Sequence, residues 1–135
     1  MSGMQSQVTG AADTIVALSS GALPAGIAVV RASGPTALAL AASVAGSCVA
    51  DRRARLATFR DPATGEAIDR GLLLAFAGPD TVTGEDLAEF HCHGGPAVVR
   101  ALIRALVEAD GVRLAEAGEF SRRGFLSGKL DLSAV

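Results

Sequence analysis

Three side chains that can bind ligands or move protons occur at alternate positions in one short segment of the chain. These are Glu89, His91 and His93. The residues between and before them are apolar: Ala88, Phe90 and Cys92. Because residues two apart in a strand share a face, we predict a strand over residues 87–92 with an apolar face for a core. Its other face presents a carboxylate and two imidazoles.

The spacing of these groups limits their chemistry. Glu89 and His93 are four residues apart, roughly 13 Å along a strand, which is too far to share one metal ion. His91 and His93 could share a metal only with a ligand from elsewhere, so we expect no metal site. Cys92 faces away from both imidazoles, so they are not expected to activate its thiol. A small-ligand site and an ordinary half-exposed strand both remain open for this face.

A glycine-rich turn follows the polar strand. Gly94 and Gly95 end the strand, and Pro96 is suited to the first position of a helix. Domains that mix helices and strands often bind small ligands at such strand-to-helix turns. The position of the turn therefore favours the ligand interpretation of the preceding strand.

Two further charges stand out. Arg31 ends an apolar strand face, so its guanidinium must reach solvent or a partner. Lys129 is the single lysine among twelve basic residues, and a compact ammonium is not equivalent to the planar fork of arginine. Residues 124–129 superficially resemble a phosphate loop, but the glycines are one residue too close and no Ser or Thr follows the lysine. We therefore expect no nucleotide binding there.

Composition indicates a folded domain. The 135 residues are 50% hydrophobic with mean hydropathy +0.40, and no apolar run approaches the ~18 residues of a membrane span. Two cysteines give no disulfide framework, which favours a cytoplasmic protein. The net charge of −2 does not favour strong nucleic-acid binding. Arg52, Arg53 and Arg55 are interpreted as a solvated loop, with RNA contact as the alternative.

Periodicity and turn residues predict alternating strands and helices, and the expected fold class is α+β, a mixed β-sheet with packed helices. The expected strands cover residues 14–18, 26–32, 56–60, 68–76, 87–92 and 112–114. The expected helices cover a segment opened by residues 33–35 and ending near 44, then residues 96–110 and 119–126. We expect residues 1–12 to be a flexible tail, residues 13–130 to form the domain, and residues 131–135 to begin a following helical domain.

Four motifs occur together and in order: residues 13–17 (DTIVA), 26–34 (GIAVVRASG), 83–95 (TGEDLAEFHCHGG) and 118–132 (GEFSRRGFLSGKLDL). Together they closely resemble the N-terminal domain of the MnmE/TrmE tRNA-modification GTPases. The resemblance implies a fold similar to the tetrahydrofolate-binding domain of the glycine-cleavage aminomethyltransferases. It also implies binding of 5-formyl- or 5,10-methylene-tetrahydrofolate, and a homodimer.

The resemblance further implies a role in a larger system. In the family, helical and GTPase domains follow, and GTP, Mg²⁺ and K⁺ belong to that GTPase domain alone. With an MnmG-type FAD protein, the family modifies carbon 5 of the wobble uridine (U34) of tRNA, the folate supplying one carbon. No catalytic residue is expected in this segment, and no membrane association is implied.

Carried over by position, the folate contacts of the family fall on Arg31, Glu89 and Lys129. The backbone of residues 93–95 (His93, Gly94 and Gly95) is a further candidate contact. The division of work between Arg31 and Lys129 stays open. The chain departs from the family pattern in residues 19–25, which lack the usual Gly-Arg-Gly, and at Gly124 and Ser127, which replace alanine and asparagine.

Two alternatives to this function remain. One is a self-contained folate-dependent one-carbon transferase, which would need a second substrate site in a short chain. The other is a dimerisation module without folate binding. For the homodimer, the opening strand and its surroundings are the expected contact, because a core built mainly of Ala, Val and Leu gains from additional burial.

Overall fold

The computed structural model describes residues 13–19 and 24–128. Strands β1 (Thr14–Leu18) and β2 (Ala25–Ser33) precede helix α2 (Ala37–Ala45). The remaining elements, in chain order, are β3 (Arg55–Arg60), β4 (Ala67–Phe76), β5 (Leu87–Gly94), α3 (Pro96–Val107), β6 (Val112–Leu114) and α4 (Glu119–Leu126). Within the described residues they form the predicted α+β fold, which is thereby confirmed.

The strands make one mixed sheet in the order β3-β4-β5-β2-β1-β6. All neighbours are antiparallel except β1 and β6, which are parallel. β1 therefore lies inside the sheet, paired on both sides, and Thr14, Ile15 and Val16 are fully buried. Its backbone is committed to intramolecular pairing, so β1 offers no free edge to a partner chain.

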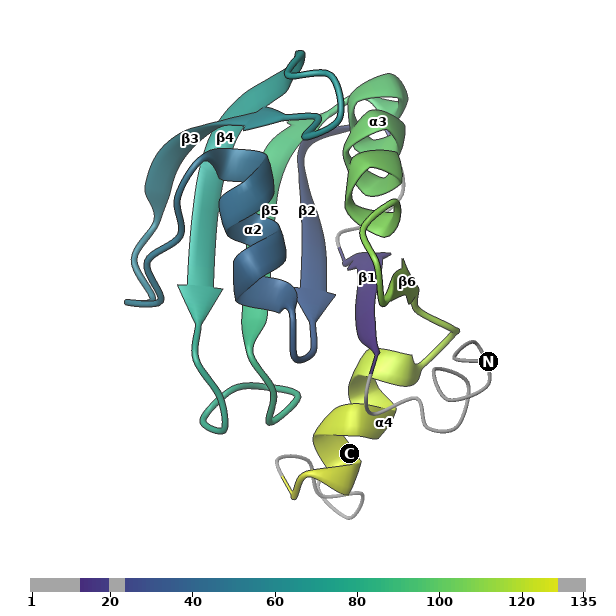
Figure 1. Cartoon of the computed structure of the whole chain (residues 1–135). Coiled ribbons are helices and arrows are strands. Elements are labelled where there is room, and N and C mark those ends of the chain that lie inside the picture. Colours follow the sequence, from purple (N-terminus) through teal and green to yellow (C-terminus); the bar gives the residue numbers. More distant parts are fainter. Residues whose placement is uncertain (1–12, 20–23, 129–135) are drawn as a thin grey trace, which may run out of the picture.

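Helices α2 and α3 cover the same face of the sheet (Figure 1). The core between them is built from small and branched residues around one aromatic pair. The rings of Phe59 and Phe90 meet edge to face, with centroids 5.5 Å apart. The apolar parity predicted for residues 87–92 points into this core, since Ala88, Phe90 and Cys92 are all buried.

Helix ends differ from the sequence prediction in two places. α2 begins at Ala37 rather than beside Gly34, because residues 34–36 form a turn packed against β1. Gly34 has a φ of 142°, and a Cβ there would lie 2.6 Å from the Cα of Thr14. α3 ends at Val107 rather than at residue 110. The chain then turns through Gly111, whose φ is 74°, into β6.

The other face of the sheet is only partly covered. Directly paired residues point to the same side, so the register places Leu56, Leu72 and His91 on this uncovered face. Ile27, Leu56 and Leu72 are 65%, 62% and 39% exposed. At one end, the loop after β4 folds over this face and buries Leu87 and Thr83. No helix of the described residues is long and apolar enough to cross a membrane.

Candidate functional site

Two of the three predicted contact residues meet on the uncovered face. β2 and β5 are antiparallel, and their register sets Arg31 directly opposite Glu89. The Nε of Arg31 donates to Oε2 of Glu89 at 2.9 Å. The two side chains are 33% and 14% exposed, so the pair is partly shielded from solvent but still accessible. Sheet pairing therefore joins two charges that lie 58 residues apart in the sequence.

His91 completes this cluster, which was not foreseen from the sequence. Its Nε2 lies 3.1 Å from Oε1 of Glu89, so each carboxylate oxygen has a partner. The sequence contains a signal for this contact, because Glu89 and His91 are two residues apart and therefore share a strand face. Arg31 and His91 hold the Glu89 carboxylate in a defined orientation, and we call these three residues the Glu89 cluster.

Cavities adjoin all three residues of the cluster: two lie beside the members of the ion pair, and a smaller one of about 190 Å³ includes His91 in its wall. Of the two larger ones, the first has a volume of about 370 Å³ and includes Glu89 in its wall. The second, of about 350 Å³, includes Arg31 and the first turn of α4. Small-ligand pockets typically measure ~300–1,000 Å³, so each of these two cavities is large enough for part of a ligand.

Lys129 lies outside the described residues, so its predicted contact stays a prediction. Residues 127 and 128, which follow α4, are the last described residues before Lys129 in the chain. Gly84, in the loop after β4, adopts a φ of 80°, and a Cβ there would lie 2.5 Å from the Ser127 side chain. The end of α4 is thus in close contact with the loop that borders the Glu89 cavity.

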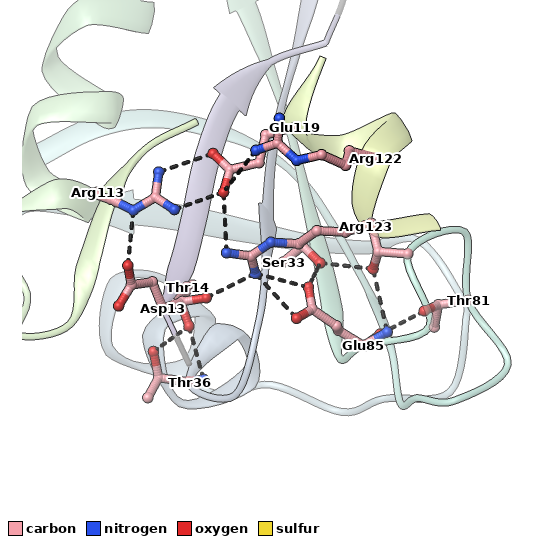
Figure 2. A network of polar contacts seen from close by, with 11 residues as sticks. Asp13, Thr14, Ser33, Thr36, Thr81, Glu85, Arg113, Glu119, Arg122 and Arg123 are labelled. Atoms are coloured by element: carbon pink, nitrogen blue, oxygen red, sulfur yellow. Dashed lines mark hydrogen bonds and ion pairs between the residues drawn. The ribbon is translucent and has the colours of Figure 1, made fainter. Parts of the chain in front are cut away.

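A second charged group fixes the position of α4 (Figure 2). Arg113, from β6, donates to Asp13 at 2.9 Å and to both oxygens of Glu119 at 2.9 and 2.6 Å. Arg123, from the last turn of α4, lies 3.3 Å from Glu119 and 3.0 Å from Glu85 in the loop after β4. We call these five residues the α4 network. It joins α4 to β6, to the start of β1 and to the loop beside the ligand cavity.

Burial and ionisation in the α4 network indicate a structural role. Glu119 and Arg123 are only 3% and 8% exposed. Hydrogen bonds from Arg113 hold the pKa of Glu119 at about 2, against burial, which alone would raise it. The same contact with Glu119, followed by that with Asp13, raises the pKa of Arg113. The charged groups of the network pair with one another, so the network anchors the helix.

The glycine-rich turn has mainly structural contacts. The backbone N–H of His93 donates to Asp69 at 2.8 Å, and its Nδ1 lies 2.9 Å from the same carboxylate. Burial opposes ionisation of Asp69, but these hydrogen bonds outweigh it and lower the pKa. A Cβ on Gly94 would lie 2.1 Å from the carbonyl oxygen of Ala25. Gly94 thus permits the close pairing of β5 with β2. Gly95 is the N-cap residue of α3 and has open space around it.

The thiols contribute no nucleophile. Cys92 points into the core, away from the histidines as predicted, and burial raises its pKa to about 11. Burial also raises the pKa of Cys48. In the described ranges, no three His, Cys, Asp or Glu side chains are grouped so as to hold a metal ion. The described side chains of the Glu89 cluster offer ionic and hydrogen-bonding contacts.

Comparison with known proteins gives a consistent result. The family model of the GTP-binding protein TrmE N-terminus matches residues 14–129. A tRNA modification GTPase MnmE of Azorhizobium caulinodans is 53% identical over 128 residues, covering 95% of this chain and 29% of the relative. A protein of the same name from Mesorhizobium japonicum is 54% identical over 120 residues, covering 89% and 27%. The chain spans less than a third of the length of these relatives.

Proposed function

Because the chain belongs to the family of TrmE N-terminal domains, we propose that it is the folate-binding domain of a tRNA modification GTPase. The ligand is 5-formyl- or 5,10-methylene-tetrahydrofolate. The observation that carries this proposal is the Glu89 cluster, an oriented carboxylate paired with a guanidinium on an uncovered sheet face with a cavity on each side.

The donor and acceptor set of the cluster fits a pterin. A carboxylate has two acceptor oxygens, and the amino and ring N–H groups of a pterin can donate to both. Arg31 supplies positive charge beside that carboxylate, for polar atoms of the ring or for a carboxylate of the ligand. When bound, the folate supplies the one-carbon unit. The residues of this chain bind and orient it.

The activity of the complete protein is part of the same proposal. GTP hydrolysis, with Mg²⁺ and K⁺, is assigned to a domain outside this segment. The modification of carbon 5 of the wobble uridine of tRNA is assigned to the complete protein together with an MnmG-type FAD partner. The setting is the cytoplasm. The names of the relatives, which are tRNA modification GTPases, support the GTPase and tRNA-modification parts of this proposal.

We also propose that the domain forms a homodimer through the uncovered sheet face. Ile27, Leu56 and Leu72 expose apolar area on that face, and a two-fold contact would bury the same patch on both copies. The opening strand and its surroundings stay the alternative contact, although β1 is paired on both sides and offers no free edge. Light scattering across a concentration series should show a mass that doubles, and Leu72→Asp should hold it near 13.5 kDa. A wild-type mass that stays near 13.5 kDa across the series contradicts the proposal.

Calorimetric titration with 5-formyl-tetrahydrofolate tests the folate proposal. Saturable binding by the wild type is expected, with a clear loss of affinity for Glu89→Gln. Glu108→Gln is the matched control, because this exposed residue near the end of α3 lies outside both cavities. Absence of saturable binding favours the dimerisation module without folate. Formyl or methylene transfer to an acceptor by the chain alone favours the self-contained transferase.

A further inference from the structure

The cavity beside Glu89 lies between the uncovered sheet face and the loop after β4. Its wall comprises strand residues, loop residues and one residue from the segment before β3: Phe76, Leu87, Glu89, Asp80, Thr81, Val82 and Arg52. Register sets Phe76 opposite Leu87, and Leu74 opposite Glu89. Phe76 and Glu89 are therefore diagonal neighbours on one face, with Cβ atoms roughly 7–8 Å apart.

Arg52 is held at this cavity by an uncommon backbone conformation. Its φ is 64°, and it is the one non-glycine residue of the described ranges with a positive φ. This conformation is unfavourable for a side chain other than Asn, Asp or Gly. The backbone N–H of Arg52 donates to the carbonyl of Ala75 at 3.1 Å, which ties the strained residue to the end of β4. Such strain is concentrated at functional sites.

Two side-chain contacts then orient the guanidinium. It stands over the Phe76 ring, with Cζ 5.4 Å from the ring centroid. Its Nη2 donates to the carbonyl oxygen of Asp80 in the loop after β4. A guanidinium has five N–H donors, and among the described residues no carboxylate forms an ion pair with this one. Arg52 therefore brings an oriented positive charge with spare donors to the cavity wall.

Glu89 and Arg52 lie in the same cavity wall but differ in whether the described residues supply an ion-pair partner. Glu89 is already neutralised by Arg31, whereas Arg52 has no such partner in the part of the chain that the structure describes. A ligand that donates hydrogen bonds at one end and carries an anion at the other matches both. The planar fork of arginine is suited to bidentate contact with a carboxylate.

We propose that Arg52 binds the carboxylate-bearing tail of the ligand whose ring is held at Glu89. This inference rests on the proposed folate function and adds a residue that neither the sequence motifs nor the resemblance indicated. Arg52 was interpreted from the sequence as part of a solvated loop. Arg52 is exposed in that loop, as predicted, and its stacking on Phe76 and its place in the cavity wall add a role in the ligand site.

The test compares two ligands and two neighbouring arginines by calorimetry. The ligands are 5-formyl-tetrahydrofolate and a 5-formyl-tetrahydropterin fragment that lacks the glutamate tail. Arg52→Asn removes the charge while keeping a residue that tolerates positive φ. Arg53→Asn is the control, since Arg53 is exposed and outside the cavity. Arg52→Lys retains the positive charge but not the planar fork of the guanidinium. Thermal unfolding verifies that each variant is folded.

Arg52→Asn should weaken binding of the complete folate about tenfold, the effect of losing one charged hydrogen-bonded contact, and leave the fragment unaffected. Arg52→Lys should lose less, and Arg53→Asn should match the wild type. Equal affinity of Arg52→Asn and wild type for the complete folate overturns the inference, as does an equal loss for both ligands. If the wild type binds neither ligand, the proposed function itself fails, which is a distinguishable result.

Discussion

The Glu89 cluster and the α4 network contain the same kinds of charged group in different surroundings. In the α4 network, Glu119 and Arg123 are almost fully buried, and the partners of each come from the protein itself. In the Glu89 cluster, Arg31 is one-third exposed and cavities adjoin both members of the ion pair. Glu119 borders the cavity beside Arg31 but is only 3% exposed, so burial of the side chain distinguishes charges that hold elements together from charges that are available to a ligand.

The largest expected effect is on stability, from Glu119→Gln. This change leaves Arg113 and Arg123 without the carboxylate that both contact. Removing one partner of a buried ion pair typically costs about 3–5 kcal/mol in the free energy of unfolding. Urea denaturation followed by circular dichroism measures the loss. Glu116→Gln, at an exposed residue three positions away, is the matched control and should change stability little. Equal losses for the two variants would show that the network is not a structural anchor.

The second prediction concerns how the free energy of unfolding depends on pH through Glu119. The pKa of Glu119 is about 2 in the folded chain, against an ordinary value of 4.5. A depressed carboxyl pKa stabilises the fold above the unfolded value, and that contribution is lost as pH falls from about 4.5 towards 2. The shift corresponds to about 3 kcal/mol.

Denaturation at a series of pH values in this window checks that expectation. Asp69 also has a lowered pKa and contributes a loss of the same sign. Glu119→Gln should therefore show a shallower decline of stability with acidification than the wild type, not a flat one. Parallel pH profiles for the two proteins would contradict the assignment to Glu119.

A smaller effect concerns the Glu89 cluster. Glu89→Gln replaces a double acceptor by a mixed donor and acceptor, so one ligand N–H faces an amide NH₂. The expected loss of binding free energy for 5-formyl-tetrahydrofolate is roughly 1–3 kcal/mol. The free energy of unfolding should fall by less than for Glu119→Gln, because the cluster is partly exposed. Calorimetry and urea denaturation on the same samples separate the two quantities. A larger loss of stability than of affinity places Glu89 with the structural charges.

His91→Ala should weaken folate binding less than Glu89→Gln does. His91 contacts one carboxylate oxygen of Glu89, and Arg31 continues to orient the other. The variant thus removes one contact that orients the Glu89 carboxylate but keeps the carboxylate itself. Calorimetry under the same conditions compares the two variants. A greater loss for His91→Ala would mean that the histidine itself contacts the ligand.

The smallest expected effect is none, for GTP. Residues 124–129 lack the spacing and the Ser or Thr of a phosphate loop, and residues 119–126 form α4. A fluorescent GTP analogue titrated with the chain should show no saturable signal. Saturable binding would reveal a nucleotide site that the motifs do not encode.

Local pattern in the sequence determined the elements and their faces. Alternation over residues 87–92 correctly separated core residues from polar ones. These signals act over a few residues, where strand and helix geometry fix which side chains share a face. Element ends were less well predicted, since Gly34 and Gly111 are governed by packing and turn conformation.

Only the tertiary structure decided which charges meet. Arg31 joins Glu89 because β2 lies beside β5, an order that sequence periodicity does not specify. The contact of Arg123 with Glu85 requires α4 to lie against the loop after β4. The stacking of Arg52 on Phe76 requires the segment before β3 to lie beside the end of β4. Strand order and helix docking depend on burial summed over the whole core, so no single segment contains that information. The sequence alone determined the faces of each element, and long-range packing determined which of those faces share a site.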